Sequence, residues 1–226
     1  MDENQENKVE ETKQEPNFKQ ETVNTFNEAK EEIKNINFME GAQAGKGLLL
    51  KLWKNPIQTI KDIANDKENK HFSTALFLVA MWVMIEFADI FFYYVSNKYA
   101  TFSFLPTLKT IIAPILNVIA MTLAIYIVNN RAKTSISKVL TSVSVAYVPS
   151  IISSVVWLLY RFSTKMYTIL SPVGGLLNVI TLILMYNTVK EFVKKDNEES
   201  AFKDFVKVEA VYYIIVFAIS FLGISL

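Results

Sequence analysis

Cysteine is absent from this 226-residue chain, and histidine occurs once, as His71. Without cysteine the chain can form no disulfide, no thiolate metal site and no cysteine nucleophile. A single histidine without companion ligands does not make a metal site, and the catalytic motifs HExxH and GxSxG are missing as well. We therefore predict no enzyme activity, no metal and no cofactor.

Arginine is scarce too, at 2 residues against 21 lysines. This bias is typical of an AT-rich genome and so indicates a low-GC bacterium. The first forty residues hold no apolar stretch that could act as a cleavable signal peptide, and we expect the N-terminus to be retained. Those forty carry eleven acidic and five basic side chains, whereas the remaining 186 residues carry eleven and eighteen. The charge is thus divided between an acidic tail and a basic remainder.

Residues 1–37 contain few apolar side chains among many Glu, Lys, Asn and Gln residues. Such a segment buries too little apolar surface to offset the entropy that is lost when it becomes ordered. We predict a disordered acidic cytoplasmic tail, with a segment that folds on a binding partner as the alternative.

Long apolar runs are what the sequence has in abundance. Twenty of the twenty-four residues at 72–95 are apolar, and a helix of that length extends about 36 Å, enough to cross a hydrocarbon core of roughly 30 Å. Four similar runs follow, so we predict an all-α membrane protein with a five-transmembrane-helix bundle over residues 72–226. The predicted spans are residues 72–95, 106–128, 139–160, 166–187 and 205–226. Short connections between some of them require sequential helices to be antiparallel neighbours.

Basic residues are distributed unevenly between the two sides of this bundle. Fourteen lie on the side of the N-terminus and four on the other side, namely Lys98, Lys109, Arg161 and Lys165. Because cytoplasmic loops of membrane proteins carry the excess of Lys and Arg, we predict a cytoplasmic N-terminus and an extracytoplasmic C-terminus.

The segment at 38–71, between the tail and the first span, combines lysines with apolar side chains. Its stretch at 41–47 superficially resembles a phosphate-binding loop, but the glycine spacing, a missing Ser or Thr and the lack of a preceding strand argue against nucleotide binding. We expect a flexible turn there, followed by two short amphipathic helices that lie against anionic lipid. Packing of the same apolar face under the bundle is the alternative. The candidate lipid-interface residues are Lys46, Lys51, Trp53, Lys54 and Pro56.

Five polar residues inside the predicted spans are candidates for an intramembrane polar network: Glu86, Asp89, Lys109, Asn117 and Asn178. A carboxylate near the bilayer centre costs about 2.5 to 3.5 kcal/mol on the insertion scale. Glu86 and Asp89 share one helix face, which should therefore look at other helices or at water. We predict an ion pair with Lys109, which lies at similar depth in the second span. A proton or cation relay and simple exposure near the interface are the alternatives.

Prolines stand inside three of the predicted spans, at Pro114, Pro149 and Pro172. A proline removes a backbone hydrogen bond and bends a helix, so we predict kinks at these positions. Broken helices hold ligands in many transporters, and kinked packing without a ligand is the simpler interpretation.

Two stretches, together with the number of spans, fit one known family. The first is LWKNPIQTIKDI, with Asn55 and Pro56 just before the bundle, and the second is SVAYVPSII, with Pro149 in the third span. In these features, over residues 48–226, the chain resembles the bacterial branch of the Yip (Ypt-interacting protein) family of five-span membrane proteins. That family has no established enzymatic chemistry; its eukaryotic members assist vesicle traffic through small GTPases, and some bacterial members are associated with ABC-type exporters. The resemblance thus implies an accessory or scaffold subunit and transfers no catalytic residue.

We therefore predict a non-enzymatic accessory or scaffold protein of a bacterial plasma membrane that binds other membrane proteins and assists an ABC-type export complex. The expected partners are exporter subunits and anionic lipids; a homo-oligomer stays open, and nothing indicates nucleic acid. One alternative is a small transporter or channel that uses Glu86, Asp89 and Lys109. Another is a protein that organises the lipids of the membrane.

Overall fold

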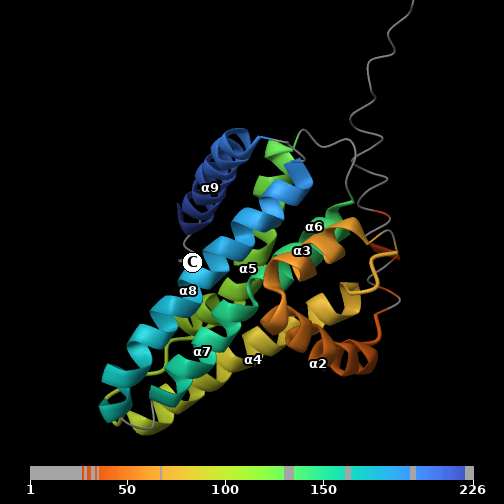
Figure 1. Cartoon of the computed structure of the whole chain (residues 1–226). Coiled ribbons are helices and arrows are strands. Elements are labelled where there is room, and N and C mark those ends of the chain that lie inside the picture. The colour runs from red at the N-terminus through yellow and green to blue at the C-terminus, as the bar shows by residue number, and fades with distance from the viewer. Residues whose placement is uncertain are drawn as a thin grey trace, which may run out of the picture.

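A computed structural model describes most of the chain from residue 36 onward (Figure 1). The described residues are 27, 30, 31, 34, 36–66, 68–129, 135–160, 164–193 and 197–221. The acidic tail predicted for residues 1–37 lies almost wholly outside them. Within these ranges the chain forms the helices α2 to α9 and no strand, which confirms the all-α class.

Three helices are long and apolar enough to cross a membrane: α4 (Phe72–Ser96), α5 (Phe104–Val128) and the Leu170–Val193 part of α8 (Thr164–Val193). The bounds of α4 and α5 closely match the first two predicted spans, whereas α8 continues to Val193 instead of ending at residue 187. Pro114 lies inside α5 and Pro172 lies inside α8, so neither proline ends its helix.

The third predicted span is a pair of helices, α6 (Ile136–Ala146) and α7 (Val148–Tyr160), which meet at Tyr147 with a bend of 42°. Pro149 stands in the first turn of α7. Its ring has no N–H to donate to the carbonyl of Val145 and crowds that carbonyl, which explains a break at this point. Counted as one broken span, the pair brings the number of candidate spans to four.

The fifth predicted span, at 205–226, is not confirmed. Helix α9 (Glu198–Phe221) covers part of it. The first half of this helix carries six charged side chains, Glu198, Glu199, Lys203, Asp204, Lys207 and Glu209. The apolar part that follows extends about 18 Å within the described residues, less than the thickness of a hydrocarbon core. By length and composition, the described helices supply three or four spans.

Residues 41–47, where a flexible turn was expected, belong to α2 (Phe38–Lys54). The helix begins there because the Asn37 side chain accepts hydrogen bonds from two backbone N–H groups of its first turn. A Cβ on Gly41 would lie 2.7 Å from the carbonyl oxygen of Ser73, so this glycine allows α2 to approach α4 closely. The turn prediction was wrong because contact with α4 outweighs the low helix propensity of glycine.

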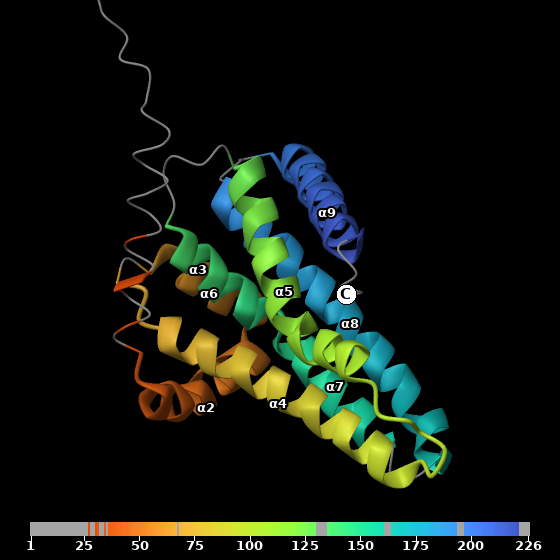
Figure 2. The ribbon, with the colours of Figure 1, turned by 180° about the vertical axis from the view of Figure 1, so that it is seen from behind.

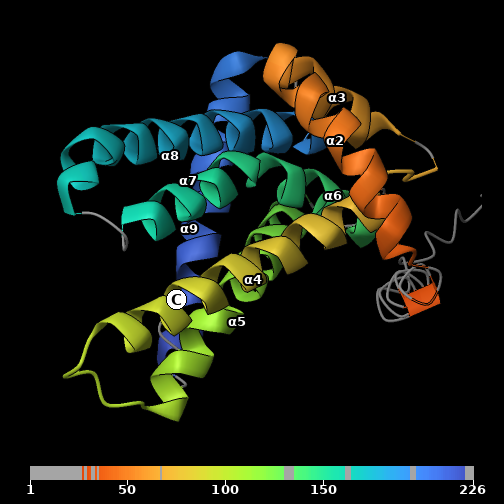
Figure 3. The ribbon, with the colours of Figure 1, turned by 90° about the horizontal axis from the view of Figure 1, so that it is seen from below.

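Helix α3 (Pro56–Asn65) begins with a proline, whose fixed φ suits the first helical position. Its Ile60 and Ile63 are buried, and the helix packs against α6 and α8. The side-chain amide of Asn65 donates to Glu191 of α8 over 3.3 Å, although the two residues are 126 positions apart. Helices α2 and α3 therefore pack under the bundle with their inner faces, as the alternative interpretation predicted (Figure 3).

Successive long helices run in opposite directions: α4 against α5, α5 against the bent α6–α7 pair, and that pair against α8 (Figures 1 and 2). The starts of α4, α6 and α9 lie with the ends of α5 and α8 on the side of α2 and α3. Helix α4 packs against α5, α6 and α7, whereas α8 packs against α7 and α9. Leu78, Ile125, Val143 and Leu184 are among the buried core residues. The lysine-rich side of the molecule is thus the side of α2 and α3, and its cytoplasmic placement stays a prediction.

Candidate functional site

The carboxylate of Glu86, on α4, accepts hydrogen bonds from two side chains. The indole N–H of Trp82, one turn earlier, lies 3.2 Å from Glu86 Oε1, and the hydroxyl of Ser154 on α7 lies 2.9 Å from the same oxygen. The Trp82 indole nitrogen also lies 3.0 Å from Ser154 Oγ. Since Trp82 and Glu86 are four residues apart, they share one helix face. Three polar side chains therefore meet between α4 and α7.

A second polar group lies beside the first, at the bend between α6 and α7. The ring of Tyr147 packs against Trp82, with 5.3 Å between the ring centroids, and the Tyr147 side chain lies close to that of Tyr212 of α9. Tyr212 in turn donates to Asn117 Oδ1 of α5 over 2.9 Å. We call the connected residues the polar core cluster: Trp82, Glu86, Asn117, Tyr147, Ser154 and Tyr212.

The polar core cluster connects α4, α5, α7 and α9 at the α6–α7 bend. In apolar surroundings, hydrogen bonds between helices satisfy polar groups that lipid cannot satisfy. The described part of the chain contains no group of three or more His, Asp or Glu side chains that could hold a metal ion. The hydrogen bonds of the cluster join α4 to α7 and α5 to α9.

The other candidate network residues lie elsewhere. Asp89 and Lys109 are both partly buried. No ion pair between Lys109 and either carboxylate occurs among the contacts of the described residues. Asn178 is exposed on α8. The structure thus brings together Glu86 and Asn117, through their partners, and the ion pair with Lys109 stays a prediction.

Helices α7 and α8 approach each other closely at Gly174. A Cβ at this position would lie 3.3 Å from Ser153 Oγ and 3.4 Å from Trp157 Nε1. The hydroxyl oxygens of Ser150 and Thr181 lie 2.8 Å apart at the same interface. Small and hydroxyl residues allow such close contact between helices in a membrane, and here they pack the second half of the broken span against α8.

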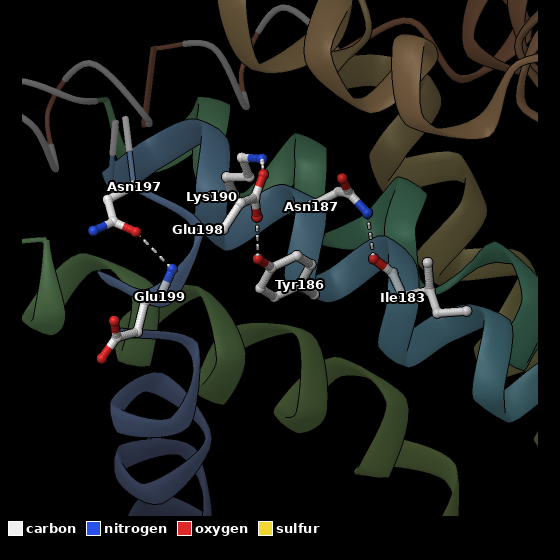
Figure 4. A network of polar contacts seen from close by, with 7 residues as sticks. All are labelled: Ile183, Tyr186, Asn187, Lys190, Asn197, Glu198 and Glu199. Carbon is white, nitrogen blue, oxygen red and sulfur yellow. Dashed lines mark hydrogen bonds and ion pairs between the residues drawn. The ribbon is translucent and has the colours of Figure 1, made fainter. Parts of the chain in front are cut away.

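A polar network at the end of α8 determines where α9 begins (Figure 4). The Glu198 carboxylate accepts hydrogen bonds from Lys190 and, over 2.8 Å, from the hydroxyl of Tyr186. These donors, Lys190 foremost, hold the pKa of Glu198 below its ordinary value. The side chain of Asn197 accepts a hydrogen bond from the backbone N–H of Glu199 and so caps α9. Because the ion pair is exposed, its effect is on geometry more than on stability.

The predicted lipid-interface residues lie on the outer side of α2 and at the start of α3. Lys46, Lys51, Trp53 and Lys54 are exposed, and Pro56 is partly buried. The inner side of α2, in contrast, buries side chains such as Leu48 and Leu52 against the bundle. Helix α2 therefore uses one face for packing and leaves its lysines outside, where contact with lipid stays a prediction.

Sequence reasoning missed four members of the polar core cluster: Trp82, Tyr147, Ser154 and Tyr212. Trp82 could have been found, since it lies one helical turn from Glu86 on the same face. Tyr147 directly precedes the Val-Pro dipeptide at which the span breaks, and that position was a second available signal. Nothing in the sequence separates Tyr212 from Tyr213, because only the packing of α9 decides which of the two rings faces inward.

Long apolar helices packed around a small polar cluster define a multi-pass helical membrane protein. Comparison with protein-family models then identifies the family, because the Yip1 domain matches residues 50–224. The chain belongs to this family, as its two motif stretches predicted. No curated protein and no solved structure matches it. The bacterial branch of the family stays a prediction.

Proposed function

We propose that this chain is a non-enzymatic accessory protein of a bacterial plasma membrane that binds other membrane proteins and assists an ABC-type export complex. One observation carries the proposal: polar side chains inside the spans bond to one another between helices. Glu86, one of the two carboxylates that the transporter alternative uses, accepts a hydrogen bond from Ser154, and Asn117 accepts one from Tyr212. Polar groups used in this way stabilise a bundle of helices.

Helix α9 is the surface that we assign to the partner. Its main packing contacts are with α5 and α8, which leaves a long outer face. The exposed large apolar side chains of this face are Phe202, Val206, Tyr213, Ile214, Phe217 and Phe221. Lys203 and Lys207 add exposed charge to its first half. Helix α9 is charged in its first half and apolar in its second half. This pattern matches a transmembrane helix of another protein that enters the membrane at the same depth and packs alongside α9.

Photocrosslinking in intact membranes tests this assignment. A photoreactive amino acid in place of Ile214 or Phe217 should crosslink to a membrane protein that mass spectrometry identifies as a subunit of an export complex. The same replacement at Leu182, which is exposed on α8, is the control and should not capture that subunit. Crosslinks to lipid alone at both α9 positions would contradict the proposal.

The rival interpretation, a transporter or channel, differs in what it requires of the charges. A chain with Glu86→Gln, Asp89→Asn and Lys109→Met should retain the crosslinked partner if the charges are structural. A proton or cation relay needs its titrating groups. Ion flux into proteoliposomes that the native chain supports and the combined variant does not would favour the transporter, provided that both chains have equal thermal stability.

A further inference from the structure

An open pocket of about 330 Å³ lies between α2 and the first half of α4. Helix α2 contributes Ala42, Lys46 and Leu50 to its lining, and α4 contributes Phe77 and Met81. Apart from Lys46, the described residues of the lining are apolar. The pocket therefore combines a wall that matches hydrocarbon with one cationic side chain.

The pocket lies at the depth of the acyl chains in the leaflet on the side of α2. Helix α4 is a candidate span that begins at Phe72. Phe77 and Met81 follow Phe72 by five and nine residues, so they lie roughly 8 and 14 Å farther along the helix. One leaflet contributes about 15 Å of hydrocarbon. An apolar pocket that is open at this depth faces the surrounding lipid.

Lys46 is the charged group of the pocket. It is exposed, and it forms no ion pair with any residue that the structure describes. Leu50, one helical turn later on the same face, is 56% exposed and also belongs to the lining. The apolar stem of a lysine can lie along hydrocarbon while its ammonium group extends to the headgroups. Lys46 can thus meet a phosphate at the boundary of the leaflet.

We infer that this pocket binds one acyl chain of an anionic phospholipid, whose phosphate lies against the ammonium group of Lys46. The lining matches methylene groups, and the lysine in the wall matches the charge of the phosphate. A protein helix of about 10 Å diameter occupies roughly 400 Å³ per turn, so the pocket would hold less than one turn of it. This site is separate from the partner surface on α9.

Photolabelling of the full chain in lipid nanodiscs tests the site. The probe is phosphatidylglycerol with a diazirine in the first half of one acyl chain, and we expect label on peptides that cover residues 42–50 and 77–81. Ala42→Phe places a ring in the pocket and should reduce this labelling about tenfold, the effect of excluding roughly two methylene groups. Ala44→Phe is the matched control, because Ala44 lies on the same helix, is exposed and is not in the lining.

The phosphate contact is tested with Lys46→Gln. This change should lower labelling by the phosphatidylglycerol probe about fivefold, the effect of one lysine near an anionic headgroup, and should leave labelling by the matching phosphatidylcholine probe unchanged. Lys51→Gln is the control for charge, because Lys51 is also exposed but lies about 140° around α2 from Lys46 and outside the lining. It should keep the native labelling. Both lysines are exposed, so this arm also decides the matter if Ala42→Phe does not fold.

Four results would overturn the inference. Native labelling of the pocket peptides in Ala42→Phe would mean that the chain does not enter the pocket. Equal losses in Lys46→Gln and Lys51→Gln would mean a general attraction to an anionic surface, and equal labelling of the native chain by both probes would mean ordinary surrounding lipid. A crosslink to a protein segment when a photoreactive amino acid replaces Leu50 would assign the pocket to a protein partner.

Discussion

Tyr212 and Tyr213 are neighbours on α9 with opposite surroundings. Tyr212 donates a hydrogen bond to Asn117 and lies close to Tyr147, whereas Tyr213 has 65% of its surface exposed. Tyr212→Phe keeps the ring but leaves the Asn117 side-chain oxygen without this hydrogen bond, at a cost of about 1 to 3 kcal/mol. The thermal unfolding midpoint in detergent should fall for Tyr212→Phe and stay near the native value for Tyr213→Phe. Equal midpoints would mean that the polar core cluster adds no stability.

Glu198 makes the junction between α8 and α9 sensitive to acid. Hydrogen bonds from Lys190 and Tyr186 lower its pKa from the ordinary value of 4.5, so the folded chain holds fewer protons there than the unfolded chain. The stabilising contribution is complete above about pH 4.5 and disappears as the pH falls through the lowered pKa. Two fluorophores across the junction should therefore report a separation of α8 and α9 in acid.

Matched variants isolate the group responsible for this acid response. Glu198→Gln should abolish the change in fluorescence between neutral and acidic pH, because the amide does not titrate. Glu199→Gln should keep it, since Glu199 pairs with Lys203 inside α9. An unchanged acid response in Glu198→Gln would assign the effect to another group.

At the level of single residues, the sequence predicts the environment of a polar side chain better than its partner. The cost of placing Glu86 in lipid is enough to predict that it faces another helix. The choice of Ser154 over Ser150 or Ser153 depends on the rotation of α7 after the bend. That rotation results from packing at Gly174, a contact between two helices, and no local pattern encodes it.

The contact between α2 and α4 depends on Gly41 of α2 and not on Gly47. A Cβ at position 41 would lie 2.7 Å from the Ser73 carbonyl oxygen, whereas a Cβ at Gly47 meets nothing within 4 Å. Gly41→Ala should therefore destabilise the chain by about 1 to 3 kcal/mol through overpacking. Gly47→Ala should stabilise it by up to about 1 kcal/mol through helix propensity.

Limited proteolysis at the start of α2, combined with thermal unfolding, measures both changes. Faster cleavage of Gly41→Ala and slower cleavage of Gly47→Ala are the expected results. If both variants behave alike, α2 does not dock on α4 through Gly41.

Among the elements, strongly apolar helices were predictable and marginal ones were not. Helices α4 and α5 match their predicted spans because burial in lipid requires a continuous apolar run, which is visible in the sequence. Helix α2 was missed because its glycines look like a turn until the surface of α4 is known. The fifth span, at 205–226, stays a prediction, because the apolar part of α9 within the described residues is shorter than a hydrocarbon core.

For the whole molecule, the course of the last helix decides on which side the chain ends. Fourteen basic residues against four predict that a reporter fused before Met1 is cytoplasmic. Helix α9 begins on the side of α2 and α3 and runs toward the opposite side (Figure 2). A reporter fused after Leu226 should therefore behave as extracytoplasmic. Cytoplasmic behaviour at both ends would mean that α9 does not cross the membrane.

The contact between α3 and α8 also constrains the order in which the chain can fold during its synthesis. Asn65 meets Glu191 across 126 residues, and a ribosome adds roughly 5 to 20 residues each second, so about 6 to 25 seconds pass before the second partner exists. During that interval α3, with its apolar Ile60 and Ile63, has been made, but α8, one of the helices against which it packs, has not. An amphipathic helix can lie at the surface of the membrane, where these apolar side chains are buried away from water. We therefore predict that the lysines of α2 and α3 hold the new chain at that surface until α8 is made.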